Sequence, residues 1–238
     1  MITVKIADLT IRLKNRYRYV EMLCEDYLVE SETVDFEVEA TDAEISEEMK
    51  NAESESGPSY AEAVCLHRQI AERLWRYDCF LLHAALIACD GRGYAFAARS
   101  GVGKSTHIGL WQKNFGERVR VINGDKPIVR ITEKGVKAYG TPWNGKEGLG
   151  ENCECPLDGI CFLSRGVENK IHSVSKEDAA MKLFTQVYLP GDAAALDKTL
   201  ALLDDFVNRI SFWELRCNME DEAALLSHKT MMQKGFQI

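Results

Sequence analysis

The residues best suited to chemistry lie in the stretch RSGVGKST, which begins at Arg99 and follows the apolar segment YAFAA. The stretch agrees with the phosphate-binding pattern G-x-x-x-x-G-K-[ST], except that Ala98 stands in place of the first glycine. Gly101 and Gly103 let the main chain approach a polyphosphate closely, so that several N–H groups can bind the anion. Alanine is the smallest replacement for the missing glycine and is acceptable if its φ is negative. The spacing therefore predicts a phosphate-binding loop with a variant first position.

Two side chains at the end of this loop complete the predicted nucleotide site. Lys104 can reach the β- and γ-phosphate oxygens of ATP, and Ser105 can offer its hydroxyl to Mg²⁺. The helical pattern that follows would direct a helix N-terminus at the anion. The alternative, a chance Gly-Lys-Ser tripeptide in a turn, does not account for a strand, loop and helix in this order. The residues predicted to bind the nucleotide are Ser100, Gly101, Val102, Gly103, Lys104, Ser105 and Thr106.

Two further residues are predicted to lie beside the phosphates. Asp125 follows the apolar strand VRVIN, and ligands of open α/β sheets bind where strands end. Its carboxylate could accept the proton of an attacking hydroxyl or hold Mg²⁺, and the alternative is an ordinary aspartate in the turn NGDKP. His83, within FLLHAALIA, either orients Asp125 or is a hydrogen-bonded core histidine. The predicted catalytic residues are Asp125, His83 and Lys104, and the predicted metal ligands are Ser105 and Asp125, with ATP and Mg²⁺ as cofactors.

The order of these motifs resembles the catalytic domain of the HPr kinase/phosphorylase family. In that family, as here, a histidine-containing strand, the loop SGVGKS and a strand that ends in aspartate follow one another. The similar region covers roughly residues 80–235, by the positions of these segments. His83 matches the family's histidine, and Asp125 matches the second of its paired aspartates. The resemblance implies a P-loop fold shared with the phosphoenolpyruvate carboxykinases and an ATP-dependent serine kinase activity.

The sequence departs from this family at several positions. Ala84 replaces the glycine that follows the family's histidine, and Gly124 stands where the first of the paired aspartates would be. Because that pair serves both phosphorylation and phosphorolysis, the resemblance does not imply the reverse reaction for this chain. GTPWNGKEGLG is the nearest counterpart of a later family signature, which aligns Glu147 with it. The first 76 residues do not resemble the family's regulatory domain.

The predicted function is an ATP-dependent kinase that phosphorylates a hydroxyl, a serine of a protein or peptide. A first alternative is a nucleotide-binding regulatory module without transfer activity, because one aspartate of the pair is missing. A second alternative is a kinase of a small hydroxylated metabolite. Carboxykinase activity is disfavoured, because the additional metal-binding lysine and histidine that this chemistry needs are not found in the sequence. Family members are oligomers, so the resemblance also implies a homo-oligomer.

Composition argues against several other classes of protein. The 238-residue chain has a formal net charge of −8 and a pI of about 5.3, which disfavours binding to nucleic acid or to an anionic membrane. Apolar runs such as FLLHAALIAC are too short to cross a bilayer, and MITVKIADLTIRLKN lacks the apolar core of a secretion signal. The 8 cysteines are therefore interpreted as reduced thiols of a cytoplasmic protein. Zinc at Cys153, Cys155 and Cys161 is an alternative, although C-x-C is an unusual spacing and no fourth ligand is evident.

The remaining patterns predict an α/β fold, a mixed sheet with flanking helices, preceded by a small β-rich lobe. In the lobe, residues 1–77, alternating segments predict a β-meander over 3–41, an acidic linker with a short helix over 42–57, and a helix over 59–77. The second domain, residues 78–238, holds the kinase-like motifs.

Strands and helices alternate within the second domain. FLLHAALIA, YAFAA, VRVIN and GICFLSRG are predicted as strands, and IVRITEKGVKAYG as a hairpin. Helix is predicted from Ser175, with Asp178 as the partner in a capping box, to about Ile210, before the strand FWELRC and a last helix. Residues 140–158 are predicted as a long glycine-rich loop. Three interpretations of Trp143 within this loop stay open: its ring stacks on adenine, it anchors a lid, or it covers the end of the sheet.

Overall fold

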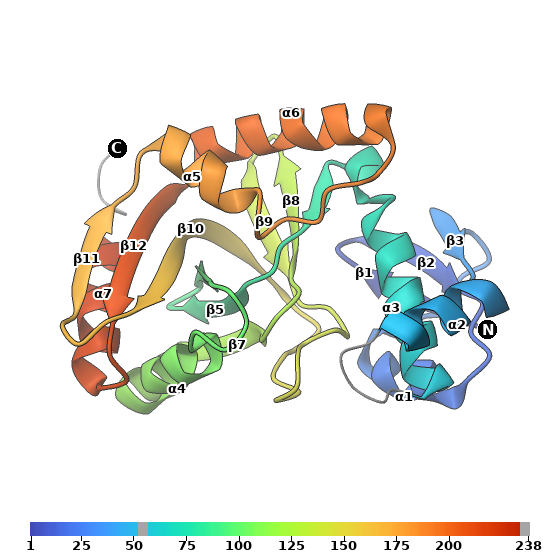
Figure 1. Cartoon of the computed structure of the whole chain (residues 1–238), viewed down its shortest axis with the longest axis horizontal. Coiled ribbons are helices and arrows are strands. Elements are labelled where there is room, and N and C mark those ends of the chain that lie inside the picture. Colours follow the sequence, from blue (N-terminus) through green and yellow to red (C-terminus); the bar gives the residue numbers. More distant parts are fainter. Residues whose placement is uncertain (52–56, 234–238) are drawn as a thin grey trace.

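The strands form two sheets in the computed structural model, which describes residues 1–51 and 57–233 (Figure 1). A three-stranded sheet of order β1-β2-β3 lies in the N-terminal lobe. The larger sheet runs β4-β8-β9-β10-β6-β5-β7, and β12 pairs with β10 and β11. Its strands are β4 (Cys79–Leu81), β5 (Ala85–Cys89), β6 (Arg92–Ala97), β7 (Val119–Asn123), β8 (Ile128–Thr132), β9 (Gly135–Tyr139), β10 (Glu154–Arg165), β11 (Lys170–Ser173) and β12 (Ser211–Cys217). The predicted class, a mixed sheet with flanking helices, is confirmed.

Helices cover both faces of the large sheet (Figure 1). On one face, α4 (Lys104–Phe115) and α7 (Asp221–Gln233) pack through apolar side chains such as Trp111 and Met231. On the other face, α5 (Lys176–Leu183) and α6 (Ala193–Arg209) pack through side chains such as Phe206. Because both faces are covered, central strands are apolar throughout, and all five residues of β5 are buried.

The long strand β10 changes partners along its length. At its start, Glu154 lies opposite Tyr139 in an antiparallel pairing with β9. Further along, β10 runs parallel to both β6 and β12. The strand thus joins an antiparallel part of the sheet to a parallel part, and the sheet curls around it (Figure 1). Since β10 begins at Glu154, the glycine-rich loop is shorter than predicted and ends at about residue 153.

The prediction of one strand over FLLHAALIA is wrong, because this segment forms β4 and β5 with a break at residues 82–84. In the break, the N–H groups donate to different segments: Leu82 to the Pro127 carbonyl at 3.0 Å and His83 to the Gln186 carbonyl at 2.6 Å. β4 then pairs with β8, whereas β5 pairs with β6 and β7. An apolar run does not reveal such a change of partners, since both strands are buried.

The N-terminal lobe is mixed rather than β-rich, and the predicted meander is wrong. Its strands are β1 (Ile2–Ile6), β2 (Leu9–Leu13) and β3 (Phe36–Val38), and its helices are α1 (Arg18–Leu23), α2 (Asp42–Asn51) and α3 (Pro58–Ala71). β1 and β2 form an antiparallel hairpin, whereas β3 runs parallel to β2. The segment YRYVEML forms α1 because Val20 and Cys24, four residues apart, face the core together. Of the predicted linker, α2 is confirmed, and residues 52–56 lie outside the described residues.

The core of the lobe continues into the large sheet. Leu81, Ile128 and Tyr139 belong to the same buried cluster as the side chains of β1, β2 and α3. The Tyr139 hydroxyl also donates to the Asp8 carboxylate at 2.8 Å. The lobe therefore packs directly against β4, β8 and β9, and a division of the chain at residues 77 and 78 stays a prediction.

The part of the chain that the structure describes also contains three short 3₁₀ segments and a break in the predicted long helix after Ser175. The 3₁₀ segments are Glu25–Tyr27, Leu74–Tyr77 and Gly116–Arg118. Ser175 caps the helix that follows it as predicted, since its hydroxyl accepts from the Asp178 N–H at 3.1 Å, and the Asp178 carboxylate is paired with that hydroxyl at 3.0 Å. The helix that starts there ends at Leu183, and α6 starts only after Pro190 and Gly191. Among the described residues, every helix is too short or too polar to span a bilayer.

Candidate active site

Three segments that are distant in the sequence meet at one edge of the large sheet. β5 runs antiparallel to both β6 and β7, with Leu86 opposite Asn123. The start of β5 therefore lies beside the ends of β6 and β7. His83 precedes β5, the phosphate-binding loop follows β6, and Asp125 follows β7, so this topology brings all three to the same edge.

Lys104, His83 and Asp125 form one polar cluster at this edge. Lys104 Nζ lies 2.9 Å from His83 Nε2 and 3.7 Å from Asp125 Oδ1. It also donates to the Ala98 carbonyl at 3.2 Å, across the loop. His83 Nε2 in turn lies 3.1 Å from Asp125 Oδ1. The structure thus brings the three predicted catalytic residues into contact, while their roles stay predictions.

The Nε2 nitrogen of His83 faces two partners that require opposite protonation. It accepts a hydrogen bond from the Lys104 ammonium only without a proton, and it donates to Asp125 only with one. A neutral imidazole can therefore satisfy one contact at a time. If the ammonium of Lys104 turns to an anion in the loop, Nε2–H is left to donate to Asp125. Anion binding would in this way resolve the cluster into a hydrogen-bonded His83–Asp125 pair.

The surrounding charges keep Asp125 ionised. Burial by itself would raise the pKa of this carboxyl, but the hydrogen bond with His83 and the charges of Lys126 and Lys104 lower the pKa to about 2. Lys126 Nζ lies 3.6 Å from Asp125 Oδ2. Burial lowers the pKa of the Lys104 ammonium, and the charge of Asp125 opposes that shift. A carboxylate with so low a pKa is suited to holding Mg²⁺ and orienting a hydroxyl, and it is a weak proton acceptor.

Asn123, which the sequence analysis missed, holds the backbone that carries Asp125. Its side chain is buried, and Oδ1 accepts from the N–H of Asp125 at 2.9 Å and from that of Lys126 at 2.6 Å. Nδ2 donates to the Thr141 carbonyl at 3.1 Å. Asn side chains commonly bond the backbone two residues on in such turns, so the sequence NGD contained this signal.

The loop predicted to bind phosphate has the geometry that its glycines predict. Gly101 has a φ of +76° and Gly103 a φ of +126°, which side chains rarely tolerate. Ala98 is not among the residues with positive φ, so alanine is accommodated there. α4 begins at Lys104, and its first helical hydrogen bond runs from the His107 N–H to the Gly103 carbonyl at 2.9 Å. The N–H groups of Lys104, Ser105 and Thr106 precede this bond, have no acceptor within the helix and are available to an anion, whereas the Val102 N–H donates to the Arg99 carbonyl at 3.2 Å.

The side chains along the loop differ in exposure. Ser100 and Thr106 are exposed, whereas Val102 and Ser105 are half-buried. The ammonium-bearing side chain of Lys104 is 9% exposed. Lysine is rarely this buried without partners, which here are the Ala98 carbonyl, His83 and Asp125.

Arg165, which the sequence did not indicate, supports the loop through hydrogen bonds to two of its carbonyl groups. β10 runs parallel to β6, so its end at Arg165 reaches the same edge of the sheet. The Arg165 guanidinium donates to the Gly101 carbonyl and, at 3.4 Å, to the Val102 carbonyl. In a trans peptide the C=O and N–H point in opposite directions, so this contact turns the Gly103 N–H to the other side of the loop. Only the parallel pairing of β10 with β6 reveals this role.

Replacing Arg165 with methionine is expected to weaken ATP binding by about tenfold, because a hydrogen bond from a charged group contributes on the order of 1.5 kcal/mol. Arg209→Met is the matched control, since that guanidinium also donates to a carbonyl, that of Thr132, at 2.9 Å. Titration calorimetry with ATP measures both variants. Equal affinities for Arg165→Met and the parent chain would contradict the support of the loop by Arg165.

The glycine-rich loop packs closely against Asp125. A Cβ atom at Gly145, whose φ is +87°, would lie 3.0 Å from the Cβ of Asp125 and 3.7 Å from Glu147 Oε2. The charge of Glu147 is also among the causes that raise the pKa of Lys104. Glu147 thus lies near the cluster on the exposed tip of this loop.

Trp143 anchors this loop to the N-terminal lobe. Its ring stacks on His67 of α3 with centroids 4.6 Å apart, and its Nε1–H donates to the Ala63 carbonyl at 3.2 Å. Stacking on adenine, anchoring a lid and covering the end of the sheet were the three interpretations of Trp143. The structure favours the anchor, because one face of the ring and the N–H already have partners in the lobe. His67 gave no sequence signal, since a histidine on an amphipathic helix is usually structural.

The packing around Gly124 leaves no room for a side chain at the position where the first of the paired aspartates was expected from the resemblance. A Cβ atom at this position would lie 2.5 Å from the Asn144 carbonyl oxygen and 3.1 Å from that of Leu149. The Gly124 N–H donates to the Leu149 carbonyl at 2.8 Å, which holds the glycine-rich loop against the end of β7. Any side chain would displace this loop, so the position is closed to a carboxylate.

Gly124→Asp is accordingly expected to destabilise the protein by at least about 2 kcal/mol, as overpacking against backbone does, and not to introduce phosphorolysis. The matched control is Gly109→Ala on α4, where an added Cβ meets nothing within 4 Å. That change is expected to be neutral or stabilising by up to about 1 kcal/mol. Urea unfolding measures both variants, and a Gly124→Asp protein as stable as the parent would refute the close packing.

Among the described residues, the cysteines of the suggested zinc site do not form a group of metal ligands. Cys155 and Cys161 are buried and Cys153 is half-buried, and all three are free thiols. Within residues 1–51 and 57–233, no group of three or more His, Cys, Asp or Glu side chains is placed to hold a metal ion.

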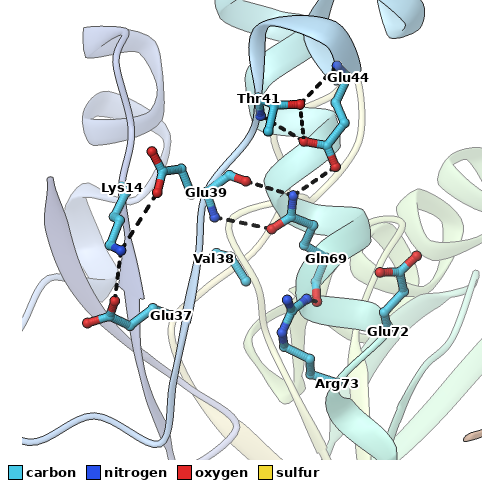
Figure 2. Close-up of a pocket in the computed structure, with 9 residues that line it drawn as sticks. All are labelled: Lys14, Glu37, Val38, Glu39, Thr41, Glu44, Gln69, Glu72 and Arg73. Carbon is cyan, nitrogen blue, oxygen red and sulfur yellow. Dashed lines mark hydrogen bonds and ion pairs between the residues drawn. The ribbon is translucent and has the colours of Figure 1, made fainter.

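A pocket of about 410 Å³ lies in the N-terminal lobe, away from this cluster. Figure 2 shows that most of its charged and polar groups pair with one another. Glu72 accepts from the Tyr188 hydroxyl at 3.2 Å. Lys14 lies 3.0 Å from Glu37 and 3.7 Å from Glu39. Gln69 exchanges hydrogen bonds with the backbone of Glu39 and donates to Glu44. Because these partners satisfy each other and no phosphate-binding residue lines the pocket, its polar groups do not indicate a nucleotide site.

Comparisons with known proteins give a likeness to solved structures only, of which 47 chains match. No protein-family model matches the chain. No curated protein matches it either. Among solved structures it is similar to the Hpr(Ser) kinase/phosphatase from Coxiella burnetii, with 8% identity and a TM-score of 0.36, over 64% of this chain and 98% of that one. A likeness of this extent does not make the chain a member of that family.

Proposed function

We propose that the chain is an ATP-dependent kinase with the P-loop fold of the HPr kinase family, and that it phosphorylates a serine hydroxyl of a protein or peptide. The observation that carries this proposal is the contact of the loop lysine, Lys104, with Asp125 and His83 at one edge of the sheet. A chance Gly-Lys-Ser turn would not direct a buried ammonium at a histidine and a carboxylate from two other strands.

The chain's residues fit a Mg²⁺–ATP complex. The Ser105 hydroxyl and the ionised Asp125 carboxylate are hard oxygen donors, which Mg²⁺ prefers alongside phosphate oxygens and water. When bound, Mg²⁺ would neutralise charge on the β- and γ-phosphates. The N–H groups of the loop and the first turn of α4 would bind the phosphates, and the ammonium of Lys104 would leave His83 for their oxygens.

In the proposed reaction, the serine oxygen forms a bond to the γ-phosphorus. The bond from that phosphorus to the β–γ bridging oxygen breaks, and ADP leaves with its electron pair. The hydroxyl proton passes to Asp125, whose carboxylate is held by His83 at 3.1 Å. Because phosphoryl transfer depends mainly on positioning and charge stabilisation, a weakly basic carboxylate is sufficient for this role.

A nucleotide-binding module without transfer activity is the second candidate. Two observations favour it: Gly124 leaves no room for a second carboxylate, and the pKa of Asp125, which burial would raise but His83 and the nearby lysines lower, is about 2. The two candidates differ in turnover rather than in binding.

The test is incubation of the chain with Mg²⁺ and γ-labelled ATP in the presence of a mixed serine-peptide library. Label on phosphoserine, lost in a Lys104 variant, supports the kinase. ATP binding with no label on any peptide and no release of phosphate supports the module. An absence of ATP binding contradicts both candidates.

A further inference from the structure

A second pocket, of about 280 Å³, adjoins the polar cluster. His83 and Lys126 line it, but no residue of the phosphate-binding loop does. Since the loop would hold the ATP phosphates, this pocket opens on a part of the cluster that the phosphates do not use. It therefore lies where the second substrate of a transfer reaction would approach Asp125, the neighbour of both His83 and Lys126.

Apolar side chains in the walls of this pocket come from three parts of the chain, and the charged side chains of Arg68 and Lys126 lie beside them. Val64 and Ala71 belong to α3 of the N-terminal lobe, Leu81 to β4, and Val187 to the segment after α5. The lobe thus supplies one wall of a compartment that opens beside the site. Apolar walls around a few polar groups are typical of ligand pockets in proteins.

Two buried polar atoms of residues that line the pocket have no hydrogen-bond partner within residues 1–51 and 57–233. They are Oε1 of Gln186, a residue only 7% exposed, and Nε2 of His67. Burial lowers the pKa of His67 to about 3, so its imidazole is neutral at physiological pH. Buried polar groups in native structures are nearly always hydrogen-bonded, and these two, one on α3 and one on the segment after α5, would be satisfied by a ligand that reaches both.

The size of the pocket distinguishes between ligand classes. Pockets that enclose a whole small-molecule ligand usually measure on the order of 300–1,000 Å³, so this one is at the lower limit. It is better suited to one side chain of a larger ligand, whose peptide groups could satisfy Gln186 and His67.

We infer that this pocket binds an apolar side chain adjacent to the acceptor serine of a peptide or protein substrate. The inference rests on the proposed function, because it requires the hydroxyl to be presented to Asp125. It deepens that function by assigning the acceptor an apolar neighbour, and it assigns the N-terminal lobe a part in substrate selection through α3.

The experiment uses the full chain, Mg²⁺, γ-labelled ATP and an oriented library of serine peptides with randomised flanking positions. The parent chain is expected to favour Val, Ile or Leu over Lys or Arg by about tenfold at one flanking position, because burial of an apolar side chain removes apolar surface from water, whereas Arg68 and Lys126 in the lining repel a further cation. Val64→Glu is expected to reverse this preference and to select Lys or Arg at the same position. Val167→Glu, at a valine 86% exposed between β10 and β11, is the matched control and is expected to retain the parent preference.

A second variant keeps the test valid if Val64→Glu does not fold. Val64→Phe fills the same pocket with an apolar ring and is expected to shift selection to Gly or Ala. The same flanking preference in the parent and in a folded Val64 variant would overturn the inference. Phosphate release from ATP with no labelled peptide would also overturn it, whereas a failure to bind ATP would contradict the proposed kinase itself.

Discussion

Replacing Lys104 with methionine is expected to reduce phosphate transfer from ATP by about 10²- to 10³-fold, the usual cost of removing one charged donor from the transferred group. Methionine retains the apolar stem and removes the ammonium that contacts His83 and Asp125. The melting temperature without nucleotide is expected to change little, because burial disfavours the charged form of this lysine and lowers its pKa. The increase in melting temperature that ATP causes is expected to disappear.

Lys113→Met is the matched control for this prediction. Lys113 lies on the same helix, α4, but its ammonium is exposed and pairs with Asp221 at 2.8 Å. This variant is expected to transfer phosphate at the parent rate. Transfer within about threefold of the parent rate in Lys104→Met would contradict a phosphate site at the loop.

Asp125→Asn is expected to lower transfer by about 10²- to 10⁴-fold while ATP still binds in the absence of Mg²⁺. Asparagine retains the shape of the side chain but removes the proton acceptor and the charge that would hold the metal. It also ends the ion pairs with Lys104 and Lys126. Asp158→Asn is the matched control, because that partly buried carboxylate pairs with Arg92 at the opposite end of β6.

The same variant has a second expected effect, on stability in acid. The hydrogen bond of His83 and the charges of Lys126 and Lys104 outweigh burial and lower the pKa of Asp125 from 3.8 to about 2. A lowered folded-state pKa stabilises the protein above pH 4, and the contribution is lost as the pH falls from about 4 to 2. For this shift it amounts to about 2 kcal/mol. The free energy of unfolding of Asp125→Asn is therefore expected to fall less steeply over this range than that of the parent.

Urea unfolding at several pH values tests this effect. An identical pH dependence in Asp125→Asn and in the parent would show that the cluster does not hold the carboxylate ionised. Unchanged transfer together with a changed pH dependence would instead retain the cluster and remove Asp125 from the reaction.

Much of the fold could be predicted because local patterns decide it. VRVIN, bounded by Gly116 and the turn NGDKP, matches β7 as Val119–Asn123, and the hairpin of β8 and β9 follows from a Gly135 turn. These segments are short, strongly apolar and bounded by turn residues, so few alternatives compete. The strand prediction for YRYVEML was wrong because tertiary packing overrides the local pattern there. Its aromatic and β-branched residues favour a strand, but the segment is helical, with Val20 packed in the core of the lobe.

The contacts of the candidate site were predictable only where the chain itself brings residues together. The loop and the start of α4 are contiguous, so their geometry followed from Gly101, Gly103 and Lys104. Arg165 could not be assigned in the same way, because it acts through the pairing of β10 with β6. Asn123 was missed although its bond to the N–H of Asp125, two residues on, is a local contact that the sequence NGD favours.

By itself, the sequence determined the α/β class, the loop glycines and the order of histidine, lysine and aspartate, because spacing and local conformation are properties of neighbouring residues. Only the tertiary structure decided that His83 Nε2 would lie between Lys104 and Asp125, that Gly124 would face the Asn144 carbonyl, and that α3 would form a wall beside the site. Such contacts depend on strand pairing and on the packing of the lobe against the sheet. Both arise from burying distant apolar surfaces together, which no local pattern specifies.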